Sequence, residues 1–207
     1  YQQLIEWYRK GDLSFAETRT VNLDEYCGLA PTHEQSYRRF MQTNFFDHID
    51  VQPENTHVPN GLAEDLEAEC ARYNRVIQEL GGIDLQLLGI GHNGHIGFNE
   101  PGHTFELETH AVDLSQTTID ANARFFASRE DVPRRALTMG IKNIMQARRI
   151  LVVVSGEDKA EIVCRAFRGP VTPQVPASIL QLHPDVTLVG DRAALHALVE
   201  AGETLCG

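Results

Sequence analysis

The chain has 207 residues, which is long enough for one well-packed domain. Its formal net charge is −11 at pH 7 and its basic residues are scattered, which argues against a surface that binds nucleic acid or anionic membranes. No apolar run approaches the length of a membrane span and no signal peptide is visible, so a cytoplasmic location is the default expectation. The cysteines stand far apart without a Cys-x-x-Cys pair, which argues against zinc ribbons and redox dithiols and predicts free thiols at Cys27, Cys70, Cys164 and Cys206.

The first part of the chain alternates between expected helices and strands. Residues 1–10 have apolar side chains at helical spacing, and Gly11 suits the end of that helix. Residues 18–23 are rich in β-branched side chains and predict a strand, and residues 35–46 and 62–80 predict amphipathic helices. Because residue 1 already lies in an expected helix and is not a methionine, we expect that a preceding segment is missing from this sequence.

The same alternation continues to the end of the chain. Strands are predicted at residues 83–88, 109–114, 149–154 and 185–190, and a short extended piece at 133–140. Helices are predicted at 117–127, 142–147, 160–167, 177–182 and 193–200. The apolar strands at 83–88 and 149–154 are typical of buried strands in a parallel sheet. The sequence therefore predicts an α/β fold with a doubly wound, mostly parallel sheet, helices on both faces, and a single domain over residues 1–207.

Residues 88–101 are the strongest candidate for a functional site. Four glycines in nine residues follow an apolar strand, and two histidines, two asparagines and one glutamate lie among and just after them. Ligands in open α/β sheets bind just beyond the carboxyl ends of strands, so this segment is either a polar active-site loop or a purely structural glycine turn. The spacing Gly89-x-Gly91-x-x-Gly94 also matches a dinucleotide fingerprint, but Pro101 interrupts the helix that such a motif requires. The histidine pair lacks a third ligand nearby, so we expect no metal ion.

Three further positions are ambiguous when only their residue types are considered. The adjacent carboxylates of Asp24 and Glu25 at a strand end are either a solvated turn or part of a site. Lys159 lies just past a strand beside the start of a helix, where it and the free amides could share a phosphate, or it is a solvated surface lysine. Arg124 is ambiguous in the same way, although a guanidinium is well shaped to bind phosphate.

Taken together, these segments resemble the glucosamine-6-phosphate deaminase family. The resemblance covers nearly the whole chain, and the Asn-Glu-Pro ending of the glycine loop is its most specific feature. The matching segments are residues 22–26, 44–48, 89–102, 121–126, 136–140 and 181–184.

The resemblance implies a cofactor-free isomerisation and deamination of glucosamine 6-phosphate to fructose 6-phosphate and ammonia. It implies that His95 assists opening of the pyranose ring, a task that suits an imidazole because its pKa lies near the operating pH. It also implies that Glu100 and Asn93 orient the ring of His95. It also implies that Asp24 moves the C2 proton to C1 through an enolamine. The nearest enzymatic alternative is a 6-phosphogluconolactonase-like hydrolase, and a non-catalytic sugar-phosphate-binding regulator is the alternative of another class.

By the same resemblance, Arg124 and Lys159 match positions that hold the sugar phosphate, and a homo-oligomer is possible. Some members carry an aspartate where this chain has Asn93, which can orient a hydrogen bond but cannot accept a proton. Residues 103–112 contain no lysine or arginine, which makes the allosteric amino-sugar-phosphate site of some members doubtful here. The first strand and the phosphate loop of the family are also absent from the sequence, so part of the substrate site is expected to be missing.

Overall fold

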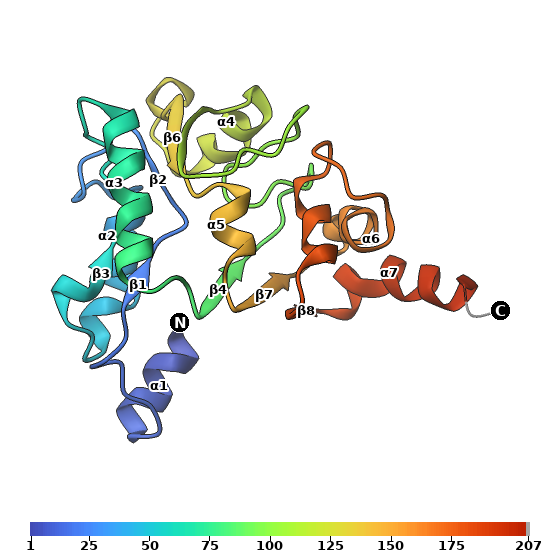
Figure 1. The fold of residues 1–207 in the computed structure, drawn as a ribbon, viewed down its shortest axis with the longest axis horizontal. Coiled ribbons are helices and arrows are strands. Elements are labelled where there is room, and N and C mark those ends of the chain that lie inside the picture. Colours follow the sequence, from blue (N-terminus) through green and yellow to red (C-terminus); the bar gives the residue numbers. More distant parts are fainter. Residues whose placement is uncertain (206–207) are drawn as a thin grey trace. The chain divides into compact units, whose positions relative to one another are not determined.

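A computed structural model describes residues 1–205 of the chain. The chain forms two compact units (Figure 1). Unit 1 contains residues Tyr1–Leu80 and His110–Thr138, and unit 2 contains residues Gly81–Thr109 and those from Met139 to the end of the described chain. The single-domain organisation of residues 1–207 stays a prediction.

The helices of unit 1 begin and end at residues that the sequence supplies for that purpose. Gly11 ends the first helix in the left-handed conformation, at φ 83°, which a glycine adopts without steric cost. The side chains of Ser36 and Asp65 cap the next two helices by accepting backbone N–H bonds. The helices are α1 (Gln2–Lys10), α2 (Tyr37–Asn44), α3 (Leu66–Glu79) and α4 (Gln116–Asn122), with short 3-10 turns η1 (Phe46–His48), η2 (Pro53–Asn55), η3 (Ala123–Phe125) and η4 (Arg129–Asp131).

Unit 1 contains two small sheets. Strand β1 (Thr20–Val21) pairs in parallel with β3 (Thr56–His57). Strand β6 (Arg135–Thr138) is the centre of an antiparallel sheet, with β2 (Asp24–Tyr26) on one side and β5 (His110–Asp113) on the other. Residues 109–114 and 133–140 were predicted to be extended, but their antiparallel pairing was not predicted, because runs this short do not encode strand direction.

An aromatic cluster joins the first two helices of unit 1. Ile5 of α1 packs with Met41, Phe45 and Phe46, and the ring of Phe15 meets that of Phe45 edge-on at a centroid distance of 5.3 Å. Met41 and Phe45 are four residues apart and therefore share one face at the end of α2. The spacing of apolar residues in this segment predicts that Phe40 faces inward together with Tyr37, Met41 and Phe45. That prediction is wrong for Phe40, which lies about 100° around the helix from Met41 and is 47% exposed.

Unit 2 is built on a parallel sheet with strand order β4-β7-β8, formed by β4 (Leu85–Leu88), β7 (Arg149–Val154) and β8 (Val186–Gly190) (Figure 1). Its helices are α5 (Ile141–Met145), α6 (Ala160–Arg168) and α7 (Arg192–Leu205), with 3-10 turns η5 (Glu157–Lys159) and η6 (Pro176–Leu182). The mixed α/β class with parallel strands and helices is confirmed.

The sheet of unit 2 buries its side chains alternately. Leu88 and Val152 are paired in register and buried, whereas Leu87 and Val153 are 47% exposed. The prediction that residues 83–88 form a buried strand therefore holds for one face of β4 and is wrong for the other, because an apolar run alone does not reveal that one face is exposed. Within residues 1–205, no helix combines the length and apolar character that a membrane span requires. Cys27, Cys70 and Cys164 are free thiols, and Cys206 lies outside the described residues.

Candidate active site

The glycine loop follows β4 directly and folds the backbone tightly around one imidazole ring. Gly94 and Gly97 have φ values of 90° and 60°, which other residues rarely adopt. The N–H of Gly91 donates to the carbonyl oxygen of His95 at 2.9 Å. A Cβ atom at residue 91 would lie 2.2–2.4 Å from the ring atoms of His95, so only a glycine lets this ring lie against the backbone.

Glu100, Asn93 and His95 form a hydrogen-bonded chain within this loop. The Nδ2 amide of Asn93 donates to Glu100 Oε2 at 2.6 Å, which leaves Asn93 Oδ1 facing His95 Nδ1 at 2.7 Å. An amide oxygen only accepts, so His95 Nδ1 must carry the proton. The predicted grouping of these residues is therefore present within unit 2, and the asparagine transmits the carboxylate's orientation to the ring.

The electrostatics of His95 favour a neutral ring. Burial lowers its pKa, and the nearby Lys159 and His92 lower it further, while the carboxylate of Glu100 acts in the opposite direction. With the proton on Nδ1, the Nε2 atom has an available lone pair, and it forms no hydrogen bond with the residues that the structure describes. A neutral imidazole with one fixed and one open nitrogen can take up a proton and return it.

Asn99 fixes the far end of the loop, a role that the sequence analysis did not assign to it. Its Nδ2 amide donates to the carbonyl oxygens of Ile96 and Met139, at 2.9 and 2.8 Å, and the residue is only 6% exposed. Because Met139 lies 40 positions away in the sequence, this bond ties the loop to a distant part of unit 2. The Asn-Glu-Pro motif was the available signal for this anchor.

Lys159 is attached to the same loop from η5, directly before α6. Its Nζ atom donates to the carbonyl oxygen of Ile90 at 2.8 Å, and burial lowers its pKa while Asp158 acts in the opposite direction. A second contact runs beside it, because His92 Nε2 lies 2.6 Å from Asp158 Oδ2. Unit 2 therefore brings the lysine to the histidine loop, and the alternative of a freely solvated surface lysine is wrong.

Asp24 is the first residue of β2 in unit 1 and lies opposite Thr138 of β6. Burial, together with the negative charge of Glu25, raises the pKa of Asp24 to about 7. Its carboxylate makes no side-chain hydrogen bond with the described residues. A carboxyl group that exchanges its proton near neutral pH, and that is not held by structural bonds, has the properties of a general base.

The neighbouring Glu25 has a different environment, which excludes a solvated turn at this position. Its side chain is 3% exposed and accepts four hydrogen bonds, from the N–H groups of Tyr26, Tyr37 and Arg38 and from the hydroxyl of Ser36. Adjacent residues of a strand point to opposite sides, so the two carboxylates are directed to different environments.

Arg124 belongs to η3 of unit 1 and is exposed. Its guanidinium lies 4.6 Å from the ring centroid of Phe125, which leaves its N–H groups available to an anion. Asp24 and Arg124 are therefore in unit 1, and His95 and Lys159 are in unit 2. The convergence of these four side chains on one substrate stays a prediction.

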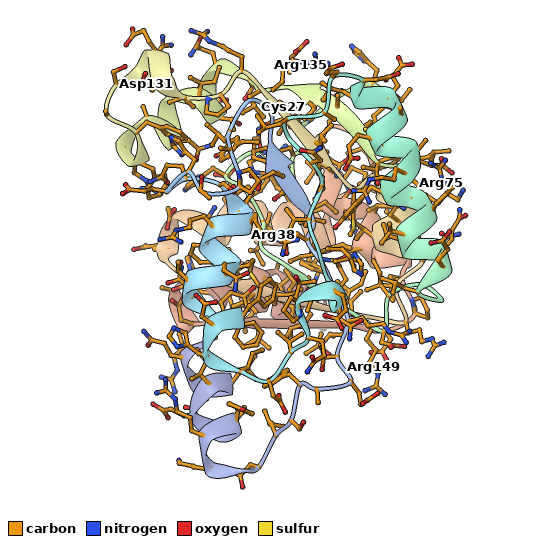
Figure 2. The ribbon with its side chains drawn as sticks, turned by 90° about the vertical axis from the view of Figure 1, so that its left-hand side faces the viewer. Cys27, Arg38, Arg75, Asp131, Arg135 and Arg149 are labelled. Atoms are coloured by element: carbon orange, nitrogen blue, oxygen red, sulfur yellow. The ribbon has the colours of Figure 1, made fainter. Side chains whose placement is uncertain are left out.

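A surface cleft of about 580 Å³ also lies in unit 1, lined in part by Cys27, Gly61, Glu64 and Arg135. Figure 2 shows Cys27 and Arg135 close together at the end of the antiparallel sheet, where the N–H of Cys27 donates to the carbonyl oxygen of Arg135. This cleft contains none of the predicted catalytic or phosphate-binding residues.

Comparison with known proteins gives a consistent set of similarities. A family model described as glucosamine-6-phosphate isomerases/6-phosphogluconolactonase matches residues 1–189. The chain is 64% identical over 189 residues to a glucosamine-6-phosphate deaminase of Lachnoclostridium phytofermentans, covering 91% of this chain and 80% of that protein. The solved structure of a monomeric glucosamine-6-phosphate deaminase of the NagB superfamily matches with a TM-score of 0.92 at 50% identity, over 96% of this chain and 82% of the other. A 6-phosphogluconolactonase structure from Thermotoga maritima matches with a TM-score of 0.67 at 20% identity, over 90% of this chain and 80% of the other, which shows similarity of fold alone.

Proposed function

Because this chain belongs to the family of glucosamine-6-phosphate isomerases and 6-phosphogluconolactonases, we propose that it converts glucosamine 6-phosphate and water into fructose 6-phosphate and ammonia. The observation that carries the proposal is the hydrogen-bonded chain from Glu100 through Asn93 to His95 in the glycine loop. The deaminase relatives at 64% and 50% identity support this reaction over lactone hydrolysis. The proposal includes a cytoplasmic location.

Ring opening is the task of His95. Its Nε2 atom accepts the proton of the C1 hydroxyl and returns a proton to the ring oxygen as the C1–O5 bond breaks. The lowered pKa of His95 keeps the ring neutral and ready to accept that proton at neutral pH. Asn93 and Glu100 hold the imidazole in one tautomer and stabilise the cation that forms transiently.

Asp24 then moves one proton between neighbouring carbons. Its carboxylate removes the C2 proton of the open-chain sugar while the C1 oxygen takes up a proton from the C2 ammonium group, which gives an enolamine. Asp24 then returns its proton to C1. The C2 iminium that results adds water, and ammonia leaves as the ketone of fructose 6-phosphate forms. A base with a pKa near 7 can both take and release a proton at neutral pH, which this transfer requires.

The phosphate group is assigned to Lys159 and Arg124. Both are cations, and a guanidinium or an ammonium binds a phosphate well. The phosphate does not react, so these side chains contribute mainly to substrate binding and to the position of C1 and C2.

The test is to incubate the full-length protein with glucosamine 6-phosphate and to measure both products. Ammonia and fructose 6-phosphate are expected to appear in equal amounts, and His95→Gln is expected to lose most of this activity while remaining folded. 6-Phosphogluconolactone is the matched control substrate. Hydrolysis of the lactone with no release of ammonia from the amino sugar would show that the protein is a lactone hydrolase and not a deaminase. Binding of either compound without turnover would indicate a regulator that binds sugar phosphates.

A further inference from the structure

Glu25 is buried beside the proposed base and is not used in the reaction described above. Its carboxylate makes four hydrogen bonds of 2.8–3.0 Å: Oε1 accepts from the N–H groups of Tyr26 and Tyr37, and Oε2 accepts from the N–H of Arg38 and the hydroxyl of Ser36. Every one of these partners donates. A carboxylate satisfies them all because its oxygens only accept.

The same bonds attach strand β2 to the start of helix α2. Tyr37 and Arg38 are the first two residues of α2, so their N–H groups have no partner within the helix. The Ser36 hydroxyl accepts from the N–H of Arg39 at 3.3 Å, so Glu25 and Ser36 together satisfy the first three amides of the helix. The helix dipole favours a negative charge at this end. Glu25 thus anchors β2 to α2 and places its carboxylate at the N-terminal end of the helix.

We propose that Glu25 is a positioning residue for the reaction: its four hydrogen bonds fix β2 against α2, and its carboxylate, on the residue directly after Asp24, acts electrostatically on the carboxylate that transfers the proton. This inference rests on the proposed function. Because strand residues alternate, the Glu25 carboxylate points toward α2 while that of Asp24 points to the opposite side of β2. The charge therefore acts through space on Asp24 without occupying the position where a substrate would lie.

The other groups around Asp24 do not supply a charge of this kind. Helix α2 carries two arginines, Arg38 and Arg39, and Arg38 is labelled in Figure 2. The guanidinium of Arg38 is held by the hydroxyl and carbonyl oxygens of Thr56, at 2.8 and 2.9 Å. Three phenols also interact with Asp24, and both burial and Asp24 raise their pKa values, so that they stay neutral. These are Tyr26 of β2, Tyr37 of α2 and Tyr73 of α3. Burial and the charge of Glu25 raise the pKa of the nearby Cys27 thiol, which therefore adds no charge either. Burial is the largest cause of the raised pKa of Asp24 and Glu25 is the second.

The test compares Glu25→Gln with Ser36→Ala in the full-length enzyme. Glutamine removes the charge, so the acidic limb of the kcat/KM profile is expected to move to lower pH by about one unit, the size typical of a nearby charge. Ser36→Ala removes one of the same hydrogen bonds and the cap of α2 but keeps the charge. It is expected to lower the melting temperature, as Glu25→Gln does, and to leave the acidic limb in place.

The outcomes separate this inference from the proposed function. A wild-type protein that releases no ammonia overturns the proposed function, and this inference with it. An active wild type whose acidic limb is the same in Glu25→Gln, or moves equally in Ser36→Ala, overturns the role of Glu25 alone. If Glu25→Gln does not fold, Glu25→Asp keeps the charge but shortens its reach. Its kcat is expected to fall at least about tenfold with the acidic limb retained, and an unchanged kcat overturns the inference.

Discussion

The same raised pKa that suits Asp24 to proton transfer is expected to lower the free energy of unfolding of the protein. The variant Asp24→Asn is expected to raise that free energy and to abolish proton transfer at C2. The carboxyl has a pKa of about 7 in the folded chain against an ordinary value of 3.8. The folded state therefore holds the proton more tightly than the unfolded state does. The free energy of unfolding falls as pH rises from about 4 to about 7, and the loss is complete above that range.

The size of this penalty follows from the difference between the two pKa values. At 1.36 kcal/mol for each pH unit, the difference between about 7 and 3.8 corresponds to about 4 kcal/mol. Asp24 is partly exposed, and water relaxes around the charge, so we expect about 2 kcal/mol. Asparagine has nearly the same shape without a charge. Asp24→Asn should therefore be more stable than the wild type at pH 8 and equally stable at pH 4, where both side chains are neutral.

The assay is urea unfolding of both proteins at pH 4, 6 and 8, together with deuterium exchange at C2 of the substrate. A gain of about 2 kcal/mol corresponds to about 4–8 °C in the melting temperature of a chain of this size. Exchange at C2 should fall to background in Asp24→Asn. Equal stability of the two proteins at pH 8 would show that the charge of Asp24 does not destabilise the folded state. Retained deuterium exchange at C2 in Asp24→Asn would show that Asp24 is not the base.

Three further predictions concern the glycine loop and its attached lysine. Asn93→Ala should lower kcat about 10–100-fold, because it releases the fixed tautomer of His95, and an unchanged kcat would show that the ring needs no such support. Gly91→Ala should also lower kcat, since the added methyl group occupies the place of the imidazole, and a crystal structure of an active variant with an undisplaced ring would contradict this. Lys159→Met should raise KM while kcat changes less than about threefold, because the phosphate does not react; steady-state kinetics that show an unchanged KM would remove Lys159 from the phosphate site.

Local patterns predicted the elements of this fold better than their pairing. Residues 149–154 form the strand that their apolar run indicates, and residues 2–10 form the helix that ends at Gly11. Hydrophobic periodicity and glycine conformation are properties of a few neighbouring residues, so they can be read directly from the sequence. The antiparallel pairing of β2 with β6 joins segments more than 100 residues apart, and no short pattern encodes it.

The same distinction applies to the candidate site. Asn93, His95 and Glu100 are within eight positions of one another, so one motif was enough to predict their grouping. The bond from Lys159 to the carbonyl of Ile90 crosses 69 positions, and only the folded unit reveals it. The sequence could not show which of Asp24 and Glu25 belongs to a site, because both residues carry the same carboxylate group. Their roles differ because the two side chains point to opposite sides of the strand, where they have different neighbours.

That difference is the physical basis of the site on β2. The carboxylate of Glu25 accepts four hydrogen bonds that hold the strand to the helix, so its oxygens are not available to remove a proton from a substrate. A carboxylate with no such bonds and partial burial is a better base, but it lacks contacts that fix its position. Because the two carboxylates are on consecutive residues, the hydrogen bonds of Glu25 fix the backbone that carries Asp24. Asp24 therefore has a fixed position although its own carboxylate makes no such bonds with the residues that the structure describes. We therefore expect Glu25 to act on Asp24 in two ways: it holds the backbone that carries Asp24, and its charge changes the affinity of Asp24 for its proton.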